Sequence, residues 1–486
     1  MAELEAQNSS QILVGMIVAI LLFLVFLAKV WNKSREVRST GKRFPPGGNG
    51  WPIIGDSFNW YKAVASSHPP RFVEQQVQRY GKIFSCRIHG KRAVVSAEAG
   101  FNRFVLQNEG RLFRSSYPKS FRDLVGKNGV ITVHGEKQRK LHSIASNMMP
   151  LEKLRFHFLH DTQTVIRRTL HGLQDAQVVP LQDVCRKVAI KLMVNQLLGE
   201  SSESEVDEMA KLFSDFADGC LSLPIHFPGF AYHTAMKARE SIIEKINKTI
   251  ESHRKQVSQG IGSGLLRRLM EEQSIPDDGL ADFILNLLFA GNETTAKTMA
   301  FAVFFLTHCS TAMKQLLDEH ESLLRTKSGF CDDMITWEDY KAMHWTQCVI
   351  DETLRIGGIA ICLMREATVD IQYQDYIIPK GCFVVPFLSA VHLNDDIYPE
   401  PLTFNPWRWM VPENQDMRNW KNSQYFMPFG GGARFCPGAE LARLQVAIFL
   451  HYFVTTYKWE QVKEDRMSFF PSARLVNGFE VQLTRI

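Results

Sequence analysis

The chain has 486 residues, of which 45% are hydrophobic and 22% are charged, and these ordinary globular values argue against long disordered tracts. Its formal net charge of +5 is small for this length, so the composition does not indicate a nucleic acid partner and fits a membrane surface or an acidic protein better. The nine cysteines stand singly, with no C-x-x-C pair, as expected for a protein in a reducing compartment.

An apolar run near the start predicts a membrane anchor. Residues 12–28 are apolar without interruption, and Lys29 and Trp31 follow where a bilayer interface would lie. Acidic residues precede the run and basic residues follow it, so we expect residues 1–11 in the lumen, a transmembrane helix at 12–31 and everything later in the cytosol, as in a single-pass protein of the endoplasmic reticulum. A cleaved signal peptide is the alternative, disfavoured because a basic start and a small-residue cleavage site are not clear.

The rest of the chain reads as a hinge followed by one large domain. Residues 32–55 are basic and then rich in proline and glycine, and 56–486 form the predicted cytosolic domain. Short apolar stretches predict strands at 83–88 and 92–96, and strand-like pieces return at 370–378 and 383–387. Helical patterns run over 151–173, 181–198, 203–217, 232–255, 280–309, 312–324, 337–356 and 439–457. Thr336 followed by Asp339 resembles a capping box for the helix at 337–356. The predicted fold class is therefore mainly α with small β-sheets.

The long apolar helix predicted around 283–305 contains a polar cluster. Its members are consecutive: Asn292, Glu293, Thr294 and Thr295. Burying such groups is costly unless they are used, although threonines at a structural kink are the simpler interpretation. The hydroxyl of Thr294 can bond back to the carbonyl of Ala290 one turn earlier and loosen the helix, while Ala290 and Gly291 leave space beside it.

The segment FGGGARFCPG, residues 429–438, carries the strongest chemical signal. Its glycines allow positive φ and close approach to a flat cofactor, and Pro437 precedes a predicted helix whose positive end favours a thiolate at Cys436. Arg434 can present a planar fork to a carboxylate. The alternative is a buried, inert cysteine beside a loop.

Two motifs make the chain similar to the cytochrome P450 family. The fixed positions of F-x-x-G-x-R-x-C-x-G, the family's haem-binding signature, are filled by Phe429, Gly432, Arg434, Cys436 and Gly438. Residues 290–295 resemble the family motif A-G-x-(D/E)-T-(T/S). The resemblance implies the P450 fold, with haem b between a long distal helix and a loop whose Cys436 sulfur binds the iron.

The same resemblance assigns roles to individual residues. Phe429 screens the sulfur, while Arg434 and Arg365, the latter in LMREAT, meet the haem propionates. Ala290 and Gly291 leave room for dioxygen, Thr294 holds it, and Glu293 relays protons. A buried network of Glu352, Arg355 and Arg408 is implied behind the haem. At Gly135–His142 the chain departs from the family, because Gln138 and His142 replace the usual propionate-binding residues; Arg139, Lys140 or a protonated His142 could substitute.

Three longer stretches, 103–113, 227–239 and 426–445, resemble the plant sterol side-chain hydroxylases. That resemblance implies hydroxylation of a sterol side chain near C-22 in brassinosteroid or related plant steroid biosynthesis, with O2 and with electrons from NADPH supplied through NADPH-cytochrome P450 reductase. By the same analogy, the expected substrate-lining segments are 115–130, 213–230, 285–291, 356–363 and 476–479. Other regiochemistry or multi-step oxidation in specialised steroid metabolism stays open. A hydroperoxide-rearranging enzyme and a non-catalytic haem-thiolate sensor or carrier are further alternatives, disfavoured by the presence of Thr294 with its acid.

Overall fold

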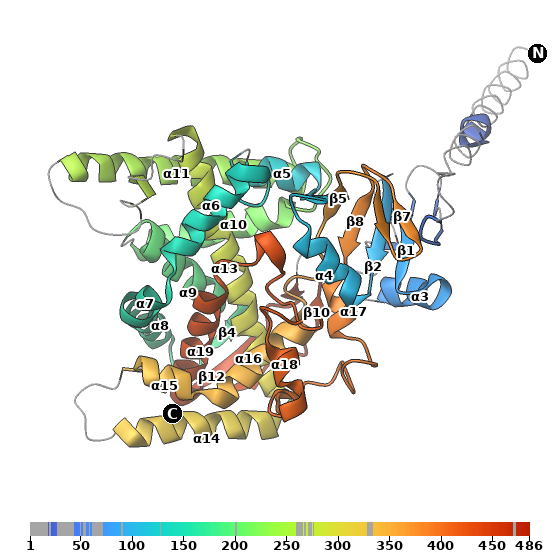
Figure 1. Cartoon of the computed structure of the whole chain (residues 1–486). Coiled ribbons are helices and arrows are strands. Elements are labelled where there is room, and N and C mark those ends of the chain that lie inside the picture. Colours follow the sequence, from blue (N-terminus) through green and yellow to red (C-terminus); the bar gives the residue numbers. More distant parts are fainter. Residues whose placement is uncertain are drawn as a thin grey trace, which may run out of the picture.

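The computed structural model describes residues 18, 21–26 and 43–486, the last range with gaps at 49, 52–54, 58, 61–70, 89–90, 127, 200–201, 259–265, 267–268, 271–274, 276, 328–333 and 470–472. The predicted lumenal segment and most of the predicted anchor at 12–31 and hinge at 32–55 lie outside these residues. Residues 21–26 are helical, and their apolar side chains are largely exposed (Figure 1). Within the described residues, no helix combines the length and the apolar character needed to cross a bilayer.

Helices form most of the molecule, and the longest of them, α13, runs through its centre (Figure 1). Helix α13 packs chiefly against α9 and also contacts α11, α16 and α19. The helices are α3 Arg71–Tyr80, α4 Ala99–Gln107, α5 Lys119–Val125, α6 Gly135–Met148, α7 Leu151–Lys153, α8 Leu159–His171, α9 Leu181–Leu197, α10 Glu203–Gly219, α11 Ala231–Ser258, α13 Asp277–Thr307, α14 Ser310–Lys327, α15 Trp337–Ala342, α16 His344–Gly357, α17 Leu388–His392, α18 Gln415–Arg418 and α19 Ala439–Thr456. Short turns of other helix types are the π-helical η1 Leu154–Phe158 and the 3-10 turns η2 Pro406–Trp409, η3 Pro412–Asn414 and η4 Gly432–Arg434.

The strands gather mainly to one side of the helical body (Figure 1). The largest sheet has the order β1-β2-β8-β5-β3, in which β2 and β8 are parallel and the other neighbours are antiparallel. A second sheet has the order β4-β12-β9, and β6-β7 and β10-β11 are separate pairs. The strands are β1 Ile83–Ile88, β2 Lys91–Ser96, β3 Phe113–Ser115, β4 Val178–Pro180, β5 Arg365–Ala367, β6 Ile371–Tyr373, β7 Tyr376–Ile378, β8 Phe383–Pro386, β9 Tyr457–Gln461, β10 Met467–Ser468, β11 Arg474–Leu475 and β12 Glu480–Arg485.

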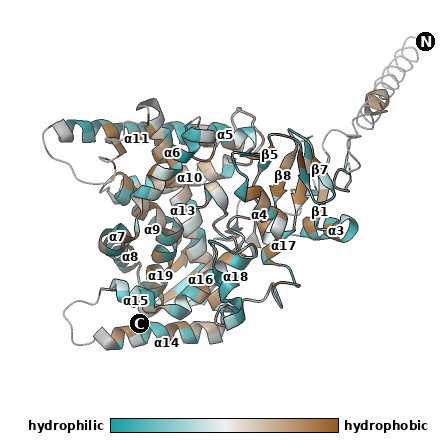
Figure 2. Ribbon diagram, viewed as in Figure 1, coloured by the Kyte–Doolittle hydropathy of each residue, from teal (hydrophilic) through white to brown (hydrophobic). Residues whose placement is uncertain are grey.

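The core forms around α13 because this helix is apolar on nearly all sides. Its residues Phe283, Met299, Phe301 and Val303 are fully buried. Figure 2 shows outer helices such as α11 and α14 with mixed hydrophobic and hydrophilic surfaces, the pattern of helices that face both core and water. Helix α13 is therefore a rigid central element on which a site can be built.

Many predicted elements are confirmed, but three predicted ranges are divided in the structure. The range 151–173 consists of α7, η1 and α8, and the strand predicted at 370–378 is the pair β6 and β7. The helix predicted over 337–356 is two helices, α15 and α16, separated at Met343. The carboxylate of Glu319, on α14, accepts hydrogen bonds from the backbone N–H groups of Trp345 and Thr346 at 2.7 and 2.9 Å. This contact caps the start of α16 from another helix, which local sequence cannot reveal.

Candidate active site

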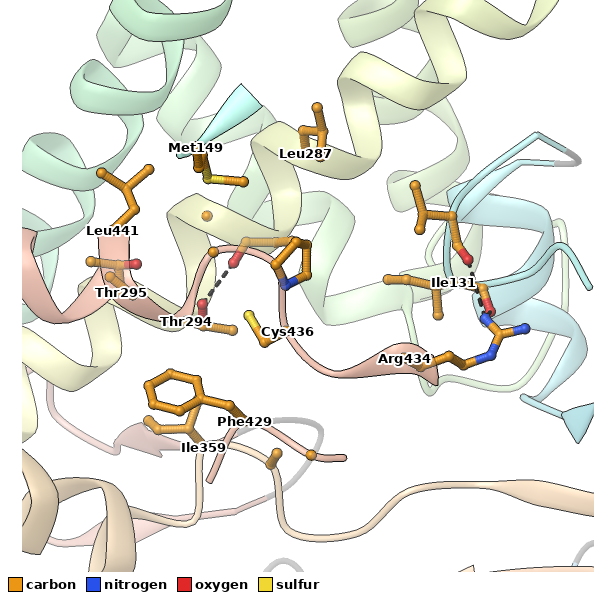
Figure 3. Close-up of a pocket in the computed structure, with 18 of the residues that line it drawn as sticks. Ile131, Met149, Leu287, Thr294, Thr295, Ile359, Phe429, Arg434, Cys436 and Leu441 are labelled. Carbon is orange, nitrogen blue, oxygen red and sulfur yellow. Dashed lines mark hydrogen bonds between the residues drawn. The ribbon is translucent and has the colours of Figure 1, made fainter. Parts of the chain in front are cut away.

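A cavity of about 420 Å³ lies between α13, α6, α9, α19 and the loop before α19. Its walls are mainly apolar, and the polar side chains on them include residues expected from sequence to bind the cofactor or act on the substrate. Those expected residues on the wall are Ala290, Gly291, Thr294, Arg365, Phe429, Arg434, Cys436 and Gly438. Figure 3 shows the sulfur of Cys436 and the hydroxyl of Thr294 in the same part of this cavity. The fold thus brings together side chains that lie far apart in the sequence.

The loop that carries Cys436 is held in shape by its backbone and its glycines. The N–H of Cys436 donates to the carbonyl of Phe429 at 3.0 Å, which closes the loop. Gly432 has φ +63°, and a Cβ there would lie 2.0 Å from the carbonyl oxygen of Leu106 at the end of α4. Only glycine fits such a close approach of two backbones. Gly438 is the N-cap residue of α19, so the helix begins at Ala439, two residues after Pro437 rather than at it.

The helix end does not by itself produce a thiolate at Cys436. Burial raises the pKa of the Cys436 thiol, and a backbone hydrogen bond from Gly438 lowers it only in part. Desolvation of a thiolate outweighs the favourable helix end. Against the effect of the helix end expected from the sequence, burial therefore favours the thiol form of Cys436 in the protein without a bound metal.

The aromatic ring of Phe429 lines the cavity and packs against a second aromatic residue. Its centroid lies 5.0 Å from that of Trp420, and Trp420 also stacks on Phe435 with centroids 5.4 Å apart. Trp420 belongs to no sequence motif and was missed in the sequence analysis. These three rings therefore form one aromatic cluster at the Cys436 loop.

Helix α13 places Thr294 as the sequence predicts. Its hydroxyl donates to the carbonyl of Ala290 at 2.6 Å (Figure 3), and both residues are exposed although they lie in the middle of a buried helix, because they face the cavity. Gly291 has a different reason for being glycine: a Cβ there would lie 2.3 Å from the sulfur of Met193 on α9. A larger residue at this position would therefore require the Met193 side chain to move.

Glu293 does not line the cavity but points to another side of α13. Its carboxylate lies 2.5 Å from the ammonium of Lys297, one turn later in the helix, and both side chains are nearly buried. Burial alone would raise the pKa of Glu293, but the attraction of Lys297 outweighs it and the pKa is lowered. Lys297 was missed in the sequence analysis, although its spacing of four residues from Glu293 is a signal for such a pair.

Two arginines expected at the cofactor share one buried carboxylate. Arg434 Nε donates to Glu109 Oε1 at 2.7 Å, and Arg365 Nε lies 2.6 Å from Glu109 Oε2 in an ion pair not aligned as a hydrogen bond. Arg434 also donates to the carbonyls of Val130, Ile131 and Val133, the second of which is visible in Figure 3. Glu109 was missed in the sequence analysis because nothing in the local sequence connects it to either arginine.

The segment that departs from the family pattern contacts the Cys436 loop instead. Gln138 Nε2 donates to the carbonyl of Ala433 at 3.1 Å, and His142 Nε2 lies 2.7 Å from the carbonyl oxygen of Phe435. Both residues line the cavity, whereas Arg139 and Lys140 are exposed and do not. These two residues therefore support the loop, and Arg139 and Lys140 are poorly placed to substitute at the cofactor.

The predicted network behind the loop is present. Both oxygens of Glu352 pair with Arg355, at 2.8 and 2.9 Å, and Oε1 also accepts from Arg408 Nε at 3.0 Å. Trp409 Nε1 donates to Oε2 at 3.0 Å, a member that the sequence did not predict. All four side chains are buried, so the network joins α16 to η2 as one rigid unit.

The residues on the cavity wall fit a haem group. A thiol and two guanidinium groups line the same apolar space, as an iron ligand and partners for two carboxylates require, and glycines keep the approach to the flat ring open. The candidate substrate segments were predicted less well: residues of 115–130, 285–291 and 356–363 line the cavity, whereas 213–230 and 476–479 do not. Met148, Met149 and Met193 line it instead.

Comparison with known proteins identifies the family. The cytochrome P450 family model matches residues 45–479. An abietadienol/abietadienal oxidase of Pinus taeda is 41% identical over 95% of this chain and 98% of its own length. A steroid (22S)-hydroxylase of Oryza sativa subsp. japonica is 34% identical over 100% of this chain and 99% of its own. Among solved structures, the retinoic acid-bound cyanobacterial CYP120A1 matches with a TM-score of 0.79 at 25% identity, covering 92% of this chain and 100% of that one.

The chain belongs to the cytochrome P450 family, and it is a haem monooxygenase. When bound, the haem supplies a reducible iron at which dioxygen is activated. The non-catalytic sensor or carrier considered above is not supported, because these relatives are named as oxidases and hydroxylases. The residues that line the cavity would hold this group and keep water away from it.

Proposed function

We propose that this P450 oxidises a polycyclic isoprenoid at an unactivated carbon, using O2 and electrons that NADPH delivers through a membrane-bound flavoprotein reductase. One oxygen atom enters the substrate, and the other leaves as water with two protons and two electrons. The observation that carries the proposal is the apolar cavity that contains Cys436 and Thr294 together. Its scarcity of polar side chains suits a rigid hydrocarbon skeleton rather than a sugar or a peptide.

Within this class of substrates, a diterpenoid is the first candidate. The relative from Pinus taeda at 41% identity is named for an alcohol and the corresponding aldehyde, so successive oxidation of one carbon is part of the proposal. A hydroxylation of a sterol side chain near C-22 is the second candidate, supported by relatives at 34% identity that are named steroid (22S)-hydroxylases. The cavity does not distinguish the two, because both substrates are extended and apolar.

In this proposal Cys436 binds the iron, Arg434 and Arg365 bind the propionates, and Phe429 with Trp420 shields the sulfur. Thr294 holds the oxygen site in order, and Glu293 with Lys297 passes protons from the opposite face of α13. The helical residues 21–26, with exposed side chains such as Leu22 and Phe23, belong to an anchor in the endoplasmic reticulum membrane. Such an anchor places the cavity next to a bilayer that dissolves both candidate substrates.

The substrate is tested with a panel of diterpenes and sterols. Microsomes with the full chain and a reductase are incubated with abietadiene, abietadienol, cholesterol and campesterol, and products are read by mass spectrometry. The proposal expects oxygenated products from the diterpenes, with the alcohol carried on to aldehyde or acid. Oxidation of the sterols alone selects the second candidate, and no product from any of the four contradicts the proposal.

The test of the iron ligand uses Cys436→Ala with Cys362→Ala as the control, since Cys362 is another cysteine whose burial raises its thiol pKa to about 12. The difference band of the ferrous carbon monoxide complex near 450 nm, which a thiolate ligand produces, should disappear in the first variant and persist in the second. Retention of the band in Cys436→Ala would remove this residue as the ligand.

A further inference from the structure

Glu109 is a buried carboxylate that pairs with Arg365 and Arg434, two of the three arginines that line the cavity. Its side chain is 4% exposed, while those of Arg365 and Arg434 are 3% and 11% exposed. Glu109 does not line the cavity itself, so it lies behind the guanidinium groups that do. Glu109 therefore balances part of the positive charge that Arg365 and Arg434 bring to the cavity wall.

The turn that carries Glu109 is rigid. The carbonyl of Asn108 accepts from the N–H groups of Arg111, Leu112 and Phe113 at 3.0 to 3.2 Å, and Gly110 has φ +80°. The N–H of Ser115 donates to Glu109 Oε1 at 3.2 Å. A carboxylate fixed in this way sets the positions of both arginines, which come from β5 and from the Cys436 loop.

We propose that Glu109 is a positioning residue for the haem: it fixes Arg365 and Arg434 as a pair directed at the propionates, and its negative charge lowers the reduction potential of the bound iron. The second effect follows because reduction adds an electron to a site of low dielectric, and a nearby buried negative charge opposes this. The proposal rests on the haem assignment above and concerns a residue that no part of that assignment uses.

The test compares substitutions of Glu109 with those of Glu366, the next residue after Arg365 in β5. Glu366 pairs at 2.6 Å with the exposed Arg114, so it offers the same change of charge without a contact to either cavity arginine. In the purified holoprotein, Glu109→Gln should raise the equilibrium constant for one-electron reduction by mediator dyes about tenfold, a shift of about 59 mV to more positive potential. Glu366→Gln should change it less than threefold.

Glu109→Asp separates position from charge. It keeps the negative charge but shortens the side chain, so the equilibrium constant for reduction should stay within threefold of that of the wild type. Haem transfer to apomyoglobin should become about tenfold faster. Glu366→Asp should leave the rate of haem transfer unchanged. A shift in Glu109→Gln no larger than in Glu366→Gln overturns the proposal, as does unchanged transfer in Glu109→Asp. If Glu109→Gln does not retain haem, the transfer rate of Glu109→Asp decides. Wild-type protein without haem would instead refute the proposed function.

Discussion

The hydroxyl of Thr294 is held by its own helix and not by another part of the protein. Because it donates to the carbonyl of Ala290, that carbonyl accepts a side-chain hydrogen bond in addition to its role in the helix, and this polar pair faces the cavity. Thr294→Ala should leave substrate affinity unchanged but lower product formed per NADPH on the order of tenfold, with the missing electrons appearing as hydrogen peroxide.

Product and peroxide yields, measured together with reductase present, check this expectation. Thr298→Ala is the matched control, since Thr298 donates to the carbonyl of Thr294 in the same way one turn later. Thr294→Ser should restore coupling because it restores the hydroxyl. Equal peroxide yields in Thr294→Ala and wild type would contradict the role given to Thr294.

For single residues, the sequence predicted the members of the motifs but not the side chains with which they form hydrogen bonds and ion pairs. Cys436, Arg434 and Thr294 stand in recognisable patterns, and the structure places all three on one cavity wall. Glu109 lies 325 residues from Arg434, so only the fold connects them. For Cys436, the sequence indicated the nearby helix end, which favours the thiolate, but not the burial of the sulfur, which favours the thiol.

At the scale of elements, Glu352 joins α16 to the turn η2. It accepts from Arg355, Arg408 and Trp409, and these contacts are buried. Glu352→Gln would leave two buried guanidinium groups without their counter-ion, so the free energy of unfolding should fall by about 3 to 5 kcal/mol. Denaturant titration of the holoprotein measures this loss.

Glu338→Gln in the neighbouring helix α15 is the control. Glu338 pairs with Lys341 at 2.7 Å, but both side chains are more than half exposed, so its substitution should cost less than about 1 kcal/mol. A loss in Glu352→Gln as small as that of the control would mean that the network is not needed for stability.

The elements themselves were predicted well where the pattern was long. Helices α9, α13 and α19 agree with their predicted ranges within three residues, since their apolar residues repeat over several turns. The short strands β3, β5 and β10 were missed because two or three residues carry no period and exist only through pairing with distant segments. The capping box of α15 at Thr336 and Asp339 was predicted and is present.

For the whole molecule, buried neutral histidines make the fold sensitive to acid. Burial, with a smaller effect of Arg355, lowers the pKa of His392 to about 3, and its Nε2 accepts from the N–H of Met427 at 3.0 Å. Burial and the neighbouring His451 also lower the pKa of His320 well below its usual value.

The pKa of each histidine is lower in the folded state than in the unfolded chain. Their contribution to stability is therefore complete above pH 6.5 and is lost as the pH falls toward the folded pKa. Below pH 6.5 the unfolded chain binds more protons, and each histidine should steepen the fall in unfolding free energy by up to about 1.4 kcal/mol per pH unit. Denaturant midpoints of holoprotein between pH 7 and pH 5 measure this slope. His392→Gln should reduce it, while His160→Gln, a change at an exposed histidine, should not; equal slopes in all three proteins would contradict the assignment.

The proposed attachment to the membrane is expected to depend on residues before the hinge. Leu22 and Leu24 are more than half exposed in the helical residues 21–26, and a charge placed there would cost about 2.5 to 3.5 kcal/mol each in a bilayer centre. Deletion of 1–31 should therefore move the protein from the membrane pellet to the supernatant after centrifugation, with the carbon monoxide difference band intact. The double variant Leu22→Arg and Leu24→Arg should weaken attachment in the same direction, and Leu22→Ile with Leu24→Ile should leave it unchanged. If the truncated protein stays in the pellet, the exposed side chains of Leu223 and Phe227 between α10 and α11 are another apolar surface, and charged substitutions there should then release it.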